Sequence, residues 1–142
     1  MEYLTLNNGV QMPLVGFGTF MLSGETCTKS VAAAIESGYR MIDTAEASGN
    51  EKEVGAGIKA SGMDRKELFL VTKVNFKSYE NAELTVLQSL ENLQTDYIDL
   101  LLLHWPFANY YARLGAAWKS CIQKAKSGPS AFPTLSRTNF WI

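Results

Sequence analysis

Residues 68–104 read LFLVTKVNFKSYENAELTVLQSLENLQTDYIDLLLLH, and this stretch decides the fold. It begins and ends with continuous rather than alternating apolar runs, Leu68–Val74 and Tyr97–His104. Such runs are typical of strands that are buried on both faces of a parallel sheet. Between them, the apolar residues of Tyr79–Leu93 recur at helical spacing. The stretch therefore predicts two parallel strands joined by a helix.

The same pattern continues toward the N-terminus. Tyr39–Asp43 and the shorter, glycine-broken Leu14–Thr19 predict two more strands, and Thr26–Ser37 and Asn50–Ser61 predict two more helices. Gly62 follows the second of these helices, at the position where glycine commonly ends a helix. The chain is therefore expected to be an α/β protein with a β-α-β-α-β-α-β series of elements.

A hairpin precedes this series. Asn8-Gly9 is a strong hairpin signal, and the apolar runs Tyr3–Leu6 and Val10–Pro13 flank it. Repeated βαβ units build either an open doubly wound sheet or a (β/α)8 barrel, and the pattern alone does not choose between them. The GFGTFMLSGE after the first strand lacks the G-x-G-x-x-G of a doubly wound dinucleotide fold. As part of a barrel, which typically takes about 250 residues, the chain would be one half.

Composition excludes several classes of function. The formal net charge is −1, so no basic field predicts binding to nucleic acid or to an anionic membrane. Cys27 and Cys121 lack metal-ligand spacing, and no metal site is expected. The N-terminus has no apolar signal-peptide core, and no apolar run approaches the roughly 18 residues of a membrane span. A cytoplasmic protein is the default expectation.

Three predicted strands end on a polar residue: Asp43, Lys73 and His104, the only histidine. Singly, each also has a structural reading, as a turn cap, a neutralising charge and a hydrogen-bonded core residue respectively. In parallel βα sheets, however, chemistry is located at the C-terminal strand ends, and stability requires no such alignment. An acid, a lysine and a histidine together suit polarising a carbonyl and delivering a proton.

Four blocks of the chain resemble successive blocks of the aldo-keto reductases in order and spacing: LNNGVQMPLVGFGTF (6–20), GYRMIDTAEASGNEKEVG (38–55), LFLVTKV (68–74) and DYIDLLLLHWP (96–106). The resemblance covers about residues 4–112 and is nearest to members of the 2,5-diketogluconate reductase and aldose reductase kind. It implies a (β/α)8 TIM barrel, of which this chain would be the truncated N-terminal half. It also implies NADPH-dependent reduction of an aldehyde or ketone, with a tyrosine as the proton donor.

The resemblance implies a catalytic set of Asp43, Ser48, Lys73 and His104, which we expect to converge at the C-terminal end of a sheet whose strands follow chain order. Lys73 would lower the pKa of the proton donor, Asp43 would pair with Lys73, and His104 would orient the substrate carbonyl. The donor should be the tyrosine of D-T-A-x-x-Y-G-N-E, but residues 43–51 read DTAEASGNE and place Ser48 there. The serine side chain is shorter than that of tyrosine, and its aliphatic hydroxyl is a far weaker acid than a phenol, whose pKa is about 10. Carbonyl reduction by this chain is therefore expected to be lost.

The resemblance also implies binding residues. Gly18, Thr19 and Asp43 would lie near the nicotinamide and its ribose. The substrate pocket would be lined by Phe20, His104 and Trp105. For Phe20 and Trp105 a stacked structural role is an equal alternative. The residues that bind the adenosine 2′-phosphate and the pyrophosphate would lie in the second half of the barrel. NADPH binding by this chain is therefore expected to be weak.

After Ala112 the chain departs from the family blocks. When Gln123 to Leu135 are read across codon boundaries, permitted codon choices give EGKKRAIGVSNF, which fits the next family block. We therefore expect residues 1–112 to form the partial barrel and residues 113–142 to be a frameshifted, non-family tail. Gly115–Lys126 could form a helix by propensity, whereas Pro133 argues against a fifth central strand. The edge of the fourth strand would then stay unpaired, which is an aggregation hazard.

Two alternatives to an active reductase remain open at this point. One is a non-catalytic remnant, or a fragment that binds a partner through its open sheet edge. The other is a half-barrel that self-associates into a pseudo-barrel through that edge. A turnover assay with NADPH and an aldehyde distinguishes the reductase from both, and the mass in solution distinguishes the two from each other.

Overall fold

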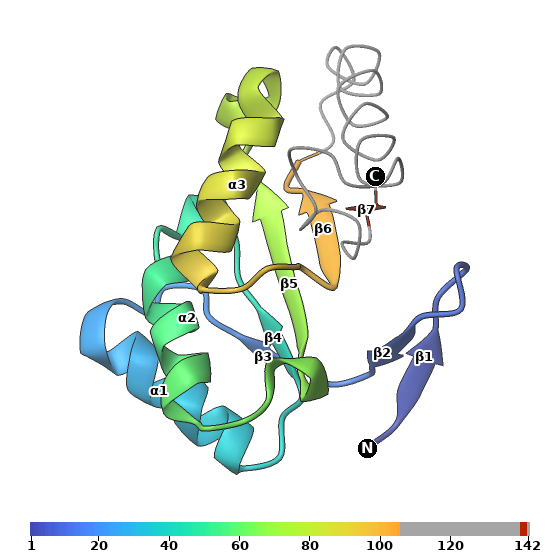
Figure 1. Ribbon diagram of the computed structural model, residues 1–142, viewed down its shortest axis with the longest axis vertical. Helices are drawn as coiled ribbons and strands as arrows, with labels where there is room; N and C mark the ends of the chain where they lie inside the picture. The colour runs from blue at the N-terminus through green and yellow to red at the C-terminus, as the bar shows by residue number, and fades with distance from the viewer. Residues whose placement is uncertain (106–139, 142) are drawn as a thin grey trace.

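The computed structural model describes residues 1–105 and 140–141 of the chain (Figure 1). In these ranges a parallel sheet has the strand order β3-β4-β5-β6-β7, and a two-stranded sheet stands apart from it. The parallel strands are β3 Phe17–Gly18, β4 Met41–Asp43, β5 Phe69–Val74, β6 Leu100–Leu103 and β7 Phe140–Trp141. The four predicted strands therefore pair in chain order, as the sequence indicates.

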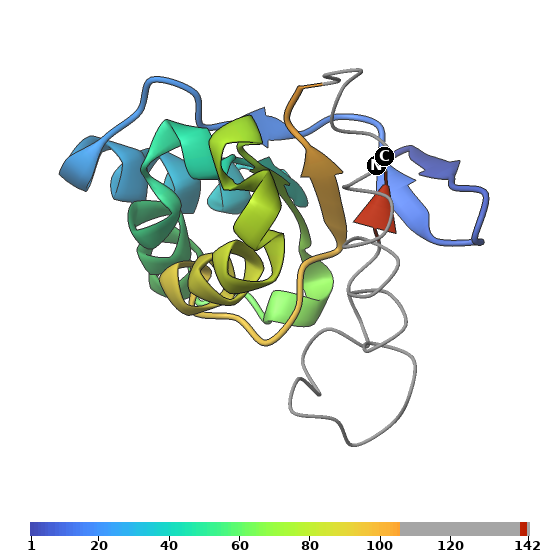
Figure 2. The same ribbon diagram turned by 90° about the horizontal axis from the view of Figure 1, so that it is seen from above.

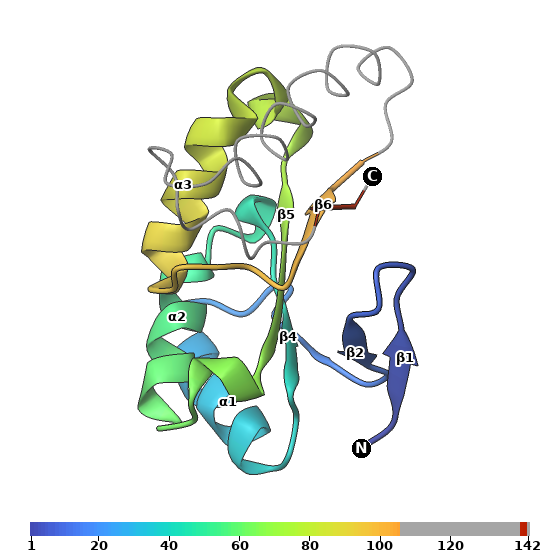
Figure 3. The ribbon, with the colours of Figure 1, turned by 45° about the vertical axis from the view of Figure 1, so that its right-hand side comes forward.

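The α-helices of the described residues lie on one face of the parallel sheet (Figure 3). They are α1 Gly24–Glu36, α2 Glu51–Ala60 and α3 Ala82–Leu93. α2 contacts both α1 and α3. A doubly wound sheet carries helices on both faces, whereas a (β/α)8 barrel carries them only on its outside. The arrangement favours the barrel, which the sequence pattern alone left undecided.

Two clusters of buried apolar side chains join the helices to the sheet. One lies between α1, α2, β4 and β5, and its fully buried members include Val31, Ile42, Val54 and Leu70. The other lies between α3, β5 and β6, and it includes Val86, Ile98 and Leu101. Full burial of one such side chain contributes about 1.5–3 kcal/mol. The clusters therefore hold the strand ends, and the polar residues on them, in fixed positions.

Glycines let α2 approach both of its neighbours closely. A Cβ on Gly55 would lie 2.7 Å from the backbone carbonyl of Leu93 in α3, and one on Gly57 would lie 2.7 Å from the Thr28 carbonyl oxygen in α1. These neighbours are backbone atoms, so a side chain fits at neither position without moving a helix. Gly62 follows α2 with φ +69°, which confirms the predicted glycine C-cap.

The start of α3 differs from the sequence-based prediction. The helix begins at Ala82 rather than Tyr79, because a 3₁₀ turn, η3 Phe76–Asn81, precedes it. The Asn75 side chain accepts a hydrogen bond from Lys77 N at 3.3 Å, and this local bond begins the turn. There are two further 3₁₀ turns: η1 Glu46–Ser48 follows β4, and η2 Arg65–Glu67 precedes β5.

The predicted N-terminal hairpin is confirmed. β1 Tyr3–Thr5 pairs antiparallel with β2 Gln11–Pro13. Gly9 in the connecting turn has φ +83°, and its N–H donates to the Leu6 carbonyl at 2.9 Å. Figure 2 shows the hairpin on the opposite side of the parallel sheet from the helices.

The expectation of an unpaired edge on the fourth parallel strand is wrong at two positions. β7 pairs parallel with β6, with Phe140 opposite Leu101 and Trp141 opposite Leu102. A strand of two residues is too short for an apolar pattern to indicate it, and Pro133 argued against a fifth strand. The predicted boundary between residues 112 and 113, Cys121, the helix expected in Gly115–Lys126 and Pro133 lie outside the described residues.

Two further properties concern the described part of the chain. None of its helices is long and apolar enough to cross a bilayer. Its His, Cys, Asp and Glu side chains form no group of three that could bind a metal ion. Cys27 is a free, buried thiol on α1, and its pKa is raised by burial and by the nearby Glu53 carboxylate.

Candidate active site

An ion pair joins the ends of β4 and β5. Lys73 Nζ lies 2.6 Å from Asp43 Oδ1 and also donates to the Thr44 carbonyl oxygen at 2.8 Å. The side chains of Lys73 and Asp43 are 20% and 40% exposed, so the pair is partly screened by water. The predicted pairing of Asp43 with Lys73 is confirmed. The bond to Thr44 also directs the ammonium toward the segment that leads to Ser48.

His104 follows β6 directly, at the same edge of the sheet. Its backbone N–H donates to the Val74 carbonyl at 3.0 Å, and this bond continues the β5–β6 ladder one position past the strand. Its ring stacks on the Trp105 ring at 5.7 Å with an interplanar angle of 3°. Its Nδ1 is buried and has no hydrogen-bond partner among the described residues. The structure thus brings His104 to the edge that holds Asp43 and Lys73, as predicted.

Ser48 lies in η1, in the loop between β4 and α2. Its N–H donates to the Ala45 carbonyl at 3.0 Å, and the left-handed Gly49 (φ 65°) ends the turn. Within the described residues, no hydrogen bond joins its hydroxyl to Asp43, Lys73 or His104. The loop therefore sits beside the ion pair, but the serine side chain does not connect to it.

The predicted nicotinamide residues pack directly against the end of β4. Gly18 pairs with Asp43 in the sheet, and Thr19 donates to the Asp43 carbonyl from both N (3.0 Å) and Oγ1 (3.1 Å). Thr19 is fully buried. Phe20 and Trp105, the predicted substrate contacts, are 80% and 55% exposed. Thr19 thus has a structural role, while the two aromatic side chains are free to contact a ligand.

Asn50 is a site residue that sequence reasoning treated only as the start of a helix. It is buried, and its Nδ2 donates to the carbonyls of Thr19 and Leu22 at 2.8 and 2.9 Å. Its Oδ1 accepts from the Thr44 hydroxyl at 2.9 Å. One amide therefore ties the loop after β3 to the loop after β4. In the sequence, Asn50 is only a polar residue directly after a glycine, and that pattern is too common to indicate a site residue.

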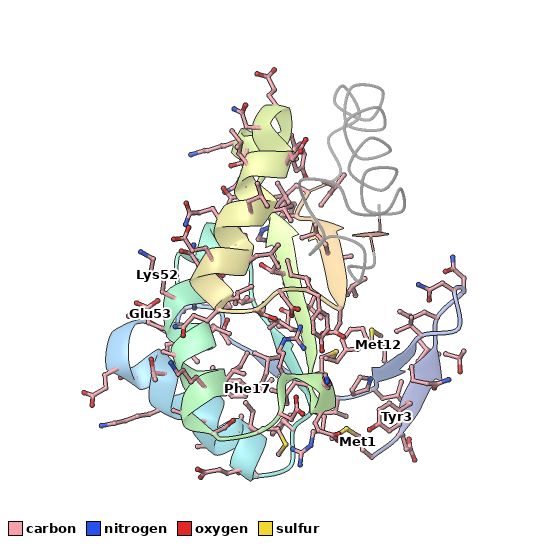
Figure 4. All side chains as sticks on the ribbon, in the orientation of Figure 1. Met1, Tyr3, Met12, Phe17, Lys52 and Glu53 are labelled. Atoms are coloured by element: carbon pink, nitrogen blue, oxygen red, sulfur yellow. The ribbon has the colours of Figure 1, made fainter. Side chains whose placement is uncertain are left out.

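Two acidic residues of the same block, Glu46 and Glu51, have structural roles. Glu46 accepts hydrogen bonds from Asn75 N at 2.7 Å and from the Ser78 hydroxyl, which joins the loops after β4 and β5. Glu51, the first residue of α2, accepts a bond from the Thr72 hydroxyl at 2.7 Å. Its neighbours Lys52 and Glu53 instead lie on the outer side of the helix (Figure 4).

The buried Glu51 carboxyl predicts a stability that depends on pH. Burial raises its pKa, and the bond from Thr72 opposes this shift only in part. The folded protein then holds this proton more tightly than the unfolded chain does. Stability should therefore fall as the pH rises from the ordinary glutamate value, about 4.3, to the raised folded value, and then level off.

Urea denaturation across this pH range checks the prediction. Glu51→Gln cannot ionise and still offers an oxygen to Thr72, so its stability should lack this decrease. Glu53→Gln, on the outer side of α2, is the matched control and should keep the wild-type decrease. Equal pH slopes in wild type and Glu51→Gln would contradict the raised pKa.

The comparisons with known proteins agree with this geometry. A family model described as the Aldo/keto reductase family matches residues 14–132. The chain belongs to the aldo-keto reductase family. The match also runs across the predicted boundary between residues 112 and 113, and that boundary stays a prediction.

Two curated relatives illustrate the similarity. The glyoxal reductase of Bacillus subtilis (strain 168) is 45% identical over 130 residues, which cover 89% of this chain and 46% of that protein. The glycerol 2-dehydrogenase (NADP(+)) of Saccharomyces cerevisiae is 43% identical over 117 residues, which cover 82% of this chain and 36% of that protein. The chain thus spans less than half the length of these two relatives.

A solved structure extends the similarity to the fold. An aldo-keto reductase from a Medee basin deep-sea metagenome library matches with a TM-score of 0.79 at 40% identity, over 87% of this chain and 46% of that one. The predicted fold class is therefore confirmed: the chain forms part of an aldo-keto reductase (β/α)8 barrel, with parallel strands, helices and an N-terminal hairpin.

Proposed function

We propose that this chain carries the nicotinamide and carbonyl end of an NADPH-dependent aldo-keto reductase site whose proton donor is replaced by Ser48. The observation that supports this most is the Lys73–Asp43 ion pair at 2.6 Å, beside His104 at one edge of the sheet. The name of the yeast relative, a glycerol 2-dehydrogenase (NADP(+)), supports the choice of cofactor. The glyoxal reductase supports a small carbonyl compound as substrate.

The described residues fit a nicotinamide ring beside Asp43. Gly18 is exposed, and a Cβ built on it would meet no atom within 4 Å, so open space lies next to the end of β4. Asn50 and Thr19 hold the backbone around this space through the bonds to Thr19 O and Asp43 O. When bound there, NADPH would supply the hydride. The chain's residues would bind the nicotinamide ring and hold it in one orientation.

The remaining step of a carbonyl reduction is the transfer of a proton to the carbonyl oxygen. Asp43 holds the Lys73 ammonium near the loop of residues 44–48, where it would lower the pKa of a phenol at position 48. His104 would orient the substrate carbonyl. Ser48 offers no acidic group at neutral pH, and loss of a general acid lowers a rate by about 10²–10⁴. We therefore propose that this chain has little or no reductase activity of its own.

Amide chemical shifts of the ¹⁵N-labelled 142-residue chain test the cofactor assignment. Nicotinamide mononucleotide should shift the amides of Gly18, Thr19 and Asp43, because these residues would surround the nicotinamide. Adenosine 2′,5′-bisphosphate should not, because the grip on that half is expected in the part of the barrel beyond this chain. The amides of Lys29 and Lys59, on the outer helices, are internal controls. Absence of any shift at Gly18 and Thr19 would contradict the proposal.

The fragment that binds partners through an open sheet edge is the less favoured alternative. β7 already occupies the β6 edge at Leu101 and Leu102. Self-association through the rest of that edge remains a proposal that the mass in solution would test. We also keep, as a proposal, a shift of reading frame near residues 112–113, which resequencing of the gene around those codons would test.

A further inference from the structure

One buried tyrosine contacts the backbone next to His104. Tyr79 lies in η3 and is 2% exposed. Its hydroxyl donates to the Trp105 carbonyl oxygen at 2.8 Å and accepts from Trp105 N at 3.1 Å. A phenolic hydroxyl can do both at once, so one side chain satisfies both backbone groups of Trp105.

These bonds fix the backbone on the C-terminal side of His104. The Trp105 N–H belongs to the planar peptide group that begins at His104, so the bond to Tyr79 sets the orientation of that plane. On the other side, His104 N donates to Val74 O at 3.0 Å. Each residue has only two soft backbone dihedrals, and here both flanking peptide groups are held. The direction of the His104 side chain follows from this restraint.

Within the described residues, the imidazole ring has few other restraints. Its Nδ1 is buried without a hydrogen-bond partner among the described residues, and its ring stacks on Trp105, the residue that Tyr79 holds. Most histidines that act in sites are oriented by a bond to one ring nitrogen. In this chain the backbone and the stacked indole take that place.

We propose that Tyr79 is a positioning residue for His104, acting through the backbone of Trp105. The tyrosine ring packs in the cluster with Val86, Ile98 and Leu101, and β6 has ended before Trp105, so no ladder partner is described for that residue. The Tyr79 hydroxyl takes the place of the hydrogen bonds that a neighbouring strand would make to Trp105. This inference rests on the proposed function only for the role of His104, and the contacts themselves do not depend on it.

The experiment observes His104 directly, which is possible because the chain has a single histidine. Long-range ¹H–¹⁵N spectra of the 142-residue chain should show one sharp imidazole spin system. Tyr79→Phe keeps the buried ring but removes the hydroxyl, so the ring signals should shift or broaden, and the Trp105 amide should exchange at least about tenfold faster with solvent.

Two control variants separate positioning from loss of stability. Val86→Ala loosens the same cluster without touching the hydroxyl, and it should lower stability while leaving the imidazole signals in place. Tyr39→Phe removes a phenolic hydroxyl elsewhere and should also leave them in place. Unchanged imidazole signals in Tyr79→Phe, or equal changes in Val86→Ala, would overturn the proposal. If Tyr79→Phe does not fold, the Trp105 amide of the wild-type chain decides: exchange as fast as an unprotected amide would overturn the proposal.

This readout does not require turnover, so it can fail or succeed independently of the reductase assignment. A completed barrel can be made by joining residues 1–112, with Ser48→Tyr, in frame to the second half of the Bacillus subtilis glyoxal reductase. If that protein is active, Tyr79→Phe should lower its kcat by about 10- to 100-fold, because a small displacement of an orienting group has effects of that size. Val86→Ala should lower stability but leave kcat within a few-fold. An inactive barrel would count against the reductase assignment, while the imidazole spectra would still test the role of Tyr79.

Discussion

Ser48→Tyr should raise carbonyl reduction by about 10²–10⁴-fold once the barrel is completed. The test joins residues 1–112 of this chain in frame to the second half of the Bacillus subtilis glyoxal reductase. That protein is 45% identical to this chain, so the interface between the halves should be retained. A tyrosine at position 48 would add a phenol beside the Lys73 ammonium, which itself lies 2.6 Å from Asp43.

The matched control for this substitution is Ser48→Phe in the same chimera. It adds the same ring without the hydroxyl, so it should fold as well as Ser48→Tyr and reduce glyoxal no faster than the Ser48 chimera. Steady-state NADPH oxidation gives kcat and KM for all three proteins. Equal rates for the tyrosine and phenylalanine variants would show that the hydroxyl at position 48 is not the proton donor.

Lys73→Met in the Ser48→Tyr chimera should lower kcat by about 10² or more. The substitution keeps a long apolar side chain but removes the charge that lowers the pKa of the phenol. It also leaves Asp43 Oδ1 and Thr44 O without the donor that bonds them at 2.6 and 2.8 Å. The effect should be on kcat rather than KM, because Lys73 acts on the proton and not on substrate binding.

The control for this variant is Lys59→Met, an exposed lysine near the end of α2. It removes the same charge far from the strand ends, and kcat should stay within about twofold, as expected for a surface substitution. A pH–rate profile adds a second readout: loss of the ammonium raises the pKa of the phenol, so the alkaline limb of the profile should move to higher pH. Retention of full kcat by Lys73→Met would contradict the assigned role of the ion pair.

Much of this fold could be predicted from the sequence because its signals are local. The apolar run of Leu68–Val74 became β5, and Tyr39–Asp43 contained β4. The hairpin at Asn8-Gly9 needed only a turn that favours positive φ. Asp43, Lys73 and His104 could be placed together because the C-terminal ends of parallel strands meet at one edge.

The rest depends on contacts between distant residues. Asn50 bonds to the Thr19 carbonyl, 31 positions away, and Tyr79 bonds to Trp105, 26 positions away. No periodicity reports such pairs, because each partner looks like an ordinary loop or helix residue. β7 was missed for the same reason, since its pairing with β6 joins segments far apart in the chain. The 3₁₀ turn before α3 was missed because Tyr79 continues the helical apolar spacing.

The measurement that bears most directly on the proposed loss of the proton donor is NADPH oxidation by the 142-residue chain itself. The assay uses glyoxal as substrate and equal molar amounts of this chain, its Ser48→Tyr variant and the Bacillus subtilis glyoxal reductase. We expect both forms of the chain to match the rate without protein: Ser48 lacks an acid, and the variant still lacks the expected cofactor grip. Turnover by the unaltered chain within about tenfold of the glyoxal reductase would contradict the proposal that Ser48 disables this site.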